Sequence, residues 1–130
     1  MNQKNLLLNN VLIASGPVII EKGKILLNKH GENKFWKFPG GDIYQKKGSL
    51  EYWCQKRVWE EMGVKIKIIK PLKPMIIWKE NKIIILIHYL AKRINKTIKP
   101  APFILDWGWF PVNKLPPHCA PNIKPVINKL

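Results

Sequence analysis

The chain has 130 residues, of which 23 are lysine or arginine and 8 are aspartate or glutamate, so its formal net charge is +15. Apolar residues make up 46% of the sequence, which excludes a disordered tail, and the length predicts a single domain over residues 1–130. The positive charge favours phosphate-rich partners, either a nucleotide-like small molecule or RNA and DNA. It disfavours a cationic substrate and a metal site built from carboxylates alone. A coding bias toward lysine explains the preference for lysine over arginine, but not the shortage of acids.

Cysteine content and hydropathy indicate a reducing compartment. Cys54 and Cys119 are too few for a disulfide scaffold, and the three histidines lack a zinc-binding spacing. The longest apolar run, Ile83 to Ile87, is far shorter than the roughly 20 residues that a membrane-spanning helix needs. No cleavable signal is expected, because Leu6–Leu8 is followed at once by Asn9. We therefore expect a cytoplasmic protein without membrane association.

The first half of the chain predicts a hairpin, a glycine loop and a helix. Residues 11–20 and 25–27 are apolar on either side of a turn, so they are expected to pair as a β-hairpin. Residues 35–38 are expected to form a short strand that ends at Pro39-Gly40-Gly41. A helix should then begin at Ser49, a good N-cap, and end at Gly63, because glycine accepts the left-handed conformation after a helix.

The second half predicts further strands and a short helix. Residues 64–68 alternate apolar and basic side chains, as in a half-exposed strand. Residues 75–78 and 83–90 should form a second hairpin, and residues 103–110 a last strand after a basic, proline-bearing loop. Asn122 is expected to cap a final helix. This order of elements predicts an α/β fold with helices packed on a mixed sheet.

The residues most suited to chemistry lie in the glycine loop and near the end of the long helix. Gly40 and Gly41 follow a strand, and Glu60 and Glu61 are expected to point back along the helix toward Lys56 and Arg57. Carboxylates on such a helix face can hold a divalent cation against a diphosphate. The alternative is an ordinary solvated helix face with i,i+4 ion pairs, after a plain strand-ending turn.

These motifs resemble the Nudix (MutT-like) family, whose box reads G-x5-E-x7-R-E-U-x-E-E-x-G-U, with U an aliphatic residue. The matching positions are Gly41, Val58, Glu60, Glu61, Gly63 and Val64, with Phe38-Pro39-Gly40 before the box and Trp107–Phe110 and Leu115-Pro116 near the end of the chain. The resemblance implies a Nudix-type α/β/α sandwich around a mixed sheet. It also implies hydrolysis of phosphoanhydrides in nucleoside-diphosphate-linked compounds, with Mg²⁺ or Mn²⁺ held by Glu60, Glu61 and the Gly40 carbonyl.

The departures from this pattern concern its charged residues. The family arginine is Lys56, the first helix glutamate is Arg57, and the leading glutamate falls on Gly48 after a one-residue insertion. Residues 95–105, where many family members carry another acid, contain no aspartate or glutamate. Helical spacing places Arg57 opposite both Glu60 and Glu61, so its guanidinium should occupy the cation position and weaken metal binding.

Two functions therefore remain open from the sequence. The first is a Nudix hydrolase with weakened Mg²⁺-dependent catalysis, in which Glu60, Glu61, Arg57 and Lys56 form the catalytic set. The second is a catalytically inactive Nudix-fold module that binds RNA, a ribonucleoprotein or another polyanion. In either case Gly40 and Gly41 are expected to approach a phosphate, and Trp36 and Lys37 to contact the ligand, with core packing as the alternative for the tryptophan.

Overall fold

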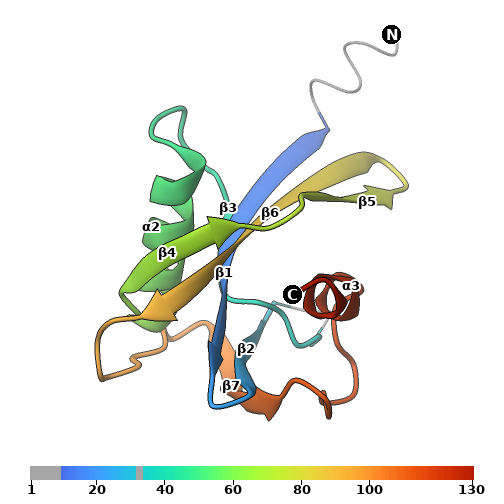
Figure 1. Ribbon diagram of the computed structural model, residues 1–130. Helices are drawn as coiled ribbons and strands as arrows, with labels where there is room; N and C mark the ends of the chain where they lie inside the picture. The colour runs from blue at the N-terminus through green and yellow to red at the C-terminus, as the bar shows by residue number, and fades with distance from the viewer. Residues whose placement is uncertain (1–9, 32–33) are drawn as a thin grey trace, which may run out of the picture.

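The computed structural model describes residues 10–31 and 34–130, so the Leu6–Leu8 run lies outside the described residues. The described part contains seven strands in one sheet and two helices (Figure 1). Their bounds are β1 Val11–Glu21, β2 Lys24–His30, β3 Gly41–Asp42, α2 Leu50–Met62, β4 Ile66–Pro71, β5 Met75–Lys79, β6 Lys82–Arg93, β7 Ile104–Pro111 and α3 Ile123–Asn128. Neither helix is long and apolar enough to cross a membrane.

The sheet is mixed, and its central pair is parallel. β1 and β6 run side by side from Val11 opposite Ile83 to Ile19 opposite Ala91, and the strand order is β4-β6-β1-β2-β7. β3 adds to β1, and β5 adds to β6, both in antiparallel orientation. The β1–β2 hairpin and the β5–β6 hairpin confirm the two hairpins predicted from apolar alternation.

Alternation along β1 and β2 builds two cores, one on each face of the sheet. Ile19 and Leu26 are buried in the core under α2, whereas their neighbours Val18 and Ile25 are buried in the core under α3. Successive side chains of a strand point to opposite faces, so both faces must be covered when both sets are apolar. Figure 1 shows the two helices on opposite sides of the sheet. The expected α/β/α sandwich is confirmed.

The ends of α2 form as the sequence predicts. The Ser49 hydroxyl accepts a hydrogen bond from the Tyr52 N–H at 3.1 Å. Gly63 has φ 62°, and its N–H donates to the Trp59 carbonyl at 2.9 Å. These caps fix where the helix starts and stops. They therefore fix which side chains near its C-terminal end face the sheet, and Glu61 is one of them.

One expectation about local structure was wrong, and a second holds only in part. Residues 35–38 form no strand, because Trp36 and Lys37 make only isolated bridges, to Cys119 and Asn28 respectively. The next residue, Pro39, has no N–H to donate to a ladder, which limits pairing at this end of the segment. Asn122 is the N-cap residue of α3 as predicted, but its side chain makes no capping hydrogen bond; its amide donates instead to the buried His88 Nε2 at 3.1 Å. A buried ring nitrogen without a partner costs more than an exposed helix end, since water can satisfy the latter.

The glycine loop is attached to β1. Gly41 and Asp42 pair with Ser15 and Ala14 as β3, a strand that the sequence does not predict. Gly40 has φ 125°, and a Cβ there would lie 2.6 Å from the Gly16 Cα. Only a residue without a side chain allows this approach, so the loop is held in one place relative to the sheet.

The C-cap of α2 gives a test of the fold. Replacing Gly63 with alanine should destabilise the protein by about 1–2 kcal/mol, because alanine is strained at positive φ. The new Cβ would also lie 3.0 Å from the Lys99 carbonyl oxygen. Urea denaturation measures the change. Gly108→Ala is the control, since its Cβ would meet the Phe110 ring at an ordinary 3.4 Å. Equal denaturation midpoints for the two variants would contradict the assigned helix end.

Candidate active site

The two adjacent glutamates of α2 point into different surroundings. Glu61 is 1% exposed and faces the sheet, whereas the side chain of Glu60 is 34% exposed. Consecutive residues on a helix differ in direction by about 100°, so one faces the core when the other faces its edge. The pair is therefore not a joint carboxylate surface, and each member has its own partners.

Glu61 is held from three sides. Its Oε1 accepts hydrogen bonds from the Asn28 amide at 2.6 Å and from the Gly40 N–H at 3.1 Å. His30 Nε2 lies 3.6 Å from its Oε2. Burial raises the pKa of this carboxyl, and the hydrogen bonds from Asn28 and Gly40 oppose that effect. Glu61 thus joins α2, β2 and the glycine loop through one buried side chain.

Glu60 lies in a cluster of exposed partners. Arg57 Nη1 is 3.3 Å from its Oε1, and Lys56 Nζ is 3.8 Å from its Oε2. The Tyr44 hydroxyl donates to the same Oε2 at 2.6 Å. The expectation that Glu60 points back toward residues 56 and 57 is therefore met, and both of its oxygens have partners.

Arg57 makes only one of the two carboxylate contacts that the sequence predicts. It pairs with Glu60 but makes no hydrogen bond to Glu61, so the expected bridge to both glutamates was wrong. The reason is that Glu61 turns toward Asn28 and Gly40. The guanidinium lies against Gly41 instead, where a Cβ would come within 2.9 Å of Nε. Its charge still acts on Glu61, lowering the pKa that burial raises.

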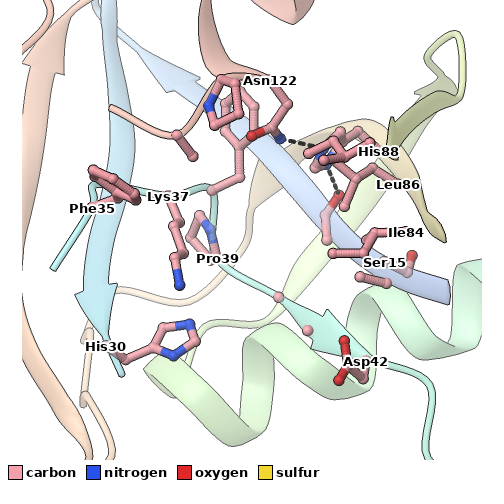
Figure 2. A pocket seen from close by; sticks show the side chains of 18 of the residues that line it. Ser15, His30, Phe35, Lys37, Pro39, Asp42, Ile84, Leu86, His88 and Asn122 are labelled. Carbon is pink, nitrogen blue, oxygen red and sulfur yellow. Dashed lines mark hydrogen bonds between the residues drawn. The ribbon is translucent and has the colours of Figure 1, made fainter. Parts of the chain in front are cut away.

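A cavity of about 370 Å³ opens beside the glycine loop (Figure 2). Its walls come from β1, from the end of β2, from β5 and β6, from residues 35–42 and from residues 120–122 just before α3, and most of them are apolar. Apolar residues lining it include Phe35, Phe38, Ile77, Ile84 and Leu86, and polar ones include Ser15, His30, Lys37, Asp42, Lys79, His88 and Asn122. This lining suits a small ligand with an apolar part and a polar or charged end.

The structure brings most of the sequence-predicted residues to this place. Gly40, Gly41 and Lys37 line the cavity, and the helix residues lie beyond the glycine loop. Trp36 does not line it. It is 8% exposed, and its ring packs edge-on against Phe110 at 4.6 Å between centroids, which favours the packing role. Its neighbour Phe35 faces the cavity instead.

Comparison with known proteins assigns the family. A sequence model of the NUDIX domain matches residues 11–130. The chain belongs to the NUDIX family. Among solved structures, the MutT NUDIX hydrolase from Burkholderia pseudomallei has a TM-score of 0.84 at 20% identity, covering 92% of this chain and 98% of that one. The MutT protein from Methanosarcina mazei Go1 has a TM-score of 0.75 at 20% identity, covering 92% of each chain.

A UDP-X diphosphatase also shares the fold of this NUDIX protein, with a TM-score of 0.76 at 21% identity. The match covers 91% of this chain and 61% of that one. Comparison with curated protein sequences finds no match.

The NUDIX site residues that sequence reasoning missed come mainly from β2 and from the start of α3. Asn28 and His30 follow Leu26 at a spacing of two, so one face of β2 changes from apolar to polar where the strand reaches Glu61. That change was the available signal. His88 and Asn122 gave none, because 34 residues separate them and only the fold brings them together.

NUDIX hydrolases generally use divalent metals, but the candidate carboxylates of this chain are largely engaged by other groups of the protein. Both Glu60 oxygens have protein partners, and the buried acceptors without a hydrogen-bond partner are Glu61 Oε2 and Asn28 Oδ1. The described residues contain no group of three or more His, Cys, Asp or Glu arranged to hold a metal. Mg²⁺ prefers six oxygen ligands, so these side chains do not form a complete site.

The buried histidine of the cavity predicts a pH-dependent stability. Burial lowers the pKa of His88 from 6.5 to about 4, against the opposing effect of the Gly16 carbonyl. Below about pH 6.5 the unfolded chain takes up a proton that the folded chain does not. His88 therefore costs no stability above about pH 6.5, and the free energy of unfolding should fall by about 3 kcal/mol as the pH drops toward 4.

Urea denaturation at pH 7 and pH 4.5 measures this loss. The variant His88→Gln keeps polar atoms in the cavity and removes the titrating ring, so it should lose distinctly less stability over the same interval. Equal losses in the two proteins would show that other groups cause the pH dependence.

Proposed function

We propose that this NUDIX protein binds nucleoside-diphosphate-linked compounds and hydrolyses their phosphoanhydride bond slowly, in a weakened reaction that depends on Mg²⁺ or Mn²⁺. One observation carries the proposal: an apolar cavity opens directly onto Gly40 and Gly41, beyond which lie Glu60 and Glu61. The name of the UDP-X diphosphatase that shares the fold supports this class of substrate.

In this proposal the cavity binds the substrate and α2 supplies the metal ligands. Phe35, which is 39% exposed, and the isoleucines of the sheet supply apolar surface for a base or another flat group. Lys37 and Lys79 line the same cavity and supply positive charge for phosphates. Glu60 and Glu61 are the proposed metal ligands with the Gly40 carbonyl, and Lys56 and Arg57 neutralise Glu60.

Catalysis should be weak because the carboxylates are already engaged. A metal at Glu60 has to compete with Arg57, Lys56 and Tyr44, and a metal at Glu61 has to enter a buried position. Few free oxygens give low affinity at a hard-cation site. We therefore expect slow turnover of a nucleoside-diphosphate panel at millimolar Mg²⁺ or Mn²⁺, measured as released phosphate or nucleotide.

The substitution Arg57→Glu tests the cause of this weakness. It removes the cation over Gly41 and adds a carboxylate beside Glu60, so Mn²⁺ affinity in calorimetric titration should rise about tenfold, or about 1.4 kcal/mol. Without metal the variant should lose a few tenths of a kcal/mol of stability from like-charge contacts. Hydrolysis should increase with metal binding.

Arg57→Gln is the matched control, because it removes the cation without adding a ligand and should give a smaller gain in Mn²⁺ affinity. Unchanged affinity in both variants would show that Arg57 does not limit metal binding. A glutamate at position 48 is a poor addition, since Gly48 has φ 77° and a Cβ there would lie 3.0 Å from the Tyr52 Cγ.

A second function is favoured by the distribution of charge. A groove of about 660 Å³ runs beside β1, β4 and β6, and Lys22, Lys70 and Lys92 line it. Arg93 in the same groove is paired with Glu21 at 2.9 Å, whereas the three lysines have no ion-pair partner among the described residues. A lysine-lined groove on a chain of charge +15 suits the phosphate backbone of RNA or DNA.

Salt dependence tests this second function. Binding of a single-stranded RNA should be detectable by mobility shift at 50 mM salt and lost at 300 mM, since release of counterions drives it. Replacing Lys22, Lys70 and Lys92 together with glutamine should weaken it. Absence of binding at 50 mM salt would leave the charge as a property of composition.

A further inference from the structure

One end of the sheet is apolar on both of its faces. Along β6, Ile84 and Leu86 line the cavity, whereas Ile83 and Ile85 point to the opposite face, because successive side chains of a strand alternate. Further along β6 that opposite face is covered, since Tyr89 lies in the core under α2. A strand that is apolar on both faces is normally covered on both. The start of β6 therefore needs a cover as well.

The side chains left uncovered form one patch, the apolar face. It consists of two rows across β5, β6 and β1, namely Trp78, Ile83 and Val11 in the first row and Ile76, Ile85 and Ile13 in the second. Trp78 is 73% exposed, Ile76 51% and Ile13 39%. Neighbouring apolar side chains that are exposed together mark a docking surface rather than a solvated one.

The position of α2 explains why this face is bare. The helix begins at Leu50, and the Leu50 carbonyl accepts a hydrogen bond from the Ser15 hydroxyl at 3.3 Å. Val11 and Ile13 precede Ser15 on β1, so they lie past the N-terminal end of the helix. Figure 1 shows the start of β1 and the β5–β6 hairpin extending away from α2.

The chain itself supplies apolar residues at the border of this face. The Asn10 carbonyl accepts a hydrogen bond from the Ile83 N–H at 2.8 Å, so the chain enters the sheet beside the first row. The sequence places Leu6–Leu8 directly before Asn9 and Asn10, and asparagine favours turns. Residues 1–9 can span about 30 Å, which is more than the width of three strands spaced about 4.8 Å apart.

Charge argues against a second copy of the chain as the occupant. Lys79 and Lys82, both exposed, flank the turn next to the first row. A second copy on this face would bring the same lysines and a further net charge of +15 against it. Residues 1–9 carry one charged side chain, Lys4, so they can cover the face with little repulsion.

We propose that Leu6–Leu8 fold back across the apolar face and form its cover. The leucines then shield Trp78 from water and pack against Ile76. They also support the cavity wall from behind, because Ile77 and Ile84 on the same two strands line the cavity. The inference does not rest on the proposed hydrolysis, since it concerns the face of the sheet turned away from the cavity.

Quenching of Trp78 fluorescence by acrylamide tests this cover in the full chain. The Trp78 signal is the difference between each protein and its Trp78→Phe counterpart. Replacing Leu6 and Leu8 together with serine should raise the quenching constant at least about twofold, because an uncovered Trp78 is 73% exposed and a covered one should be less than half as exposed. The matched control replaces Leu105 and Leu130 with serine, two exposed leucines outside the apolar face, and should leave the constant unchanged.

A double-mutant cycle shows whether the leucines touch the face itself. Leu8→Ser and Ile76→Ser should each lower the urea midpoint by about 0.5 M, as expected for a half-buried apolar side chain. The combined variant should lose less than the sum of the two, because the second change finds the contact already gone. Sedimentation of the unmodified chain should give a monomer.

Equal quenching constants in the unmodified chain and in the Leu6, Leu8 variant would overturn the proposal, and so would additive losses in the cycle. A dimer that Ile76→Ser dissociates, with no effect of the leucine substitutions, would assign the face to a second copy instead. Protection of Trp78 that depends on Leu6 and Leu8 in a monomeric protein supports the cover.

Discussion

The burial of the Glu61 carboxylate is the constraint on which the rest of the site depends. A buried charge is tolerated only where donors surround it, and here the donors come from β2 and from the glycine loop. The caps of α2 set the rotation of the helix, and that rotation directs Glu61 inward. Because Gly40 packs on β1 without a side chain, its N–H is held at the carboxylate. Sheet, loop and helix thus meet at one oxygen.

This arrangement explains why the two glutamates differ in chemistry. Glu61 is committed to holding the loop, so removing it would leave the Gly40 N–H and the Asn28 amide unpaired in the interior. Glu60 does not hold the glycine loop, and it can exchange its partners Lys56 and Arg57 at the surface. In the proposed hydrolase both carboxylates would serve the metal, whereas a binding module would need only Glu61, and only for structure. The position of Glu61 therefore supports the fold under either proposal.

The sequence was sufficient for the fold because the fold depends on local patterns. Alternation in β1, the caps Ser49 and Gly63, and the turns between strands are each readable over a few residues. The contacts of Glu60 with Lys56 and Arg57 followed from helical spacing, but the direction of Glu61 did not. Helical spacing places Glu61 near Arg57 without showing that Asn28 and Gly40 compete for it. Which of Trp36 and Phe35 is buried could not be predicted either. The segment is no regular strand, so alternation does not say which ring faces the core.

The contact between Arg57 and Gly41 also links the space in the loop to the charge on the helix. A guanidinium occupies the space into which a side chain at position 41 would project. Such a side chain would have to displace the flexible end of Arg57, and with it the contact from Nη1 to Glu60. A larger residue in the loop would therefore change the surroundings of Glu60 on the helix without touching that glutamate itself.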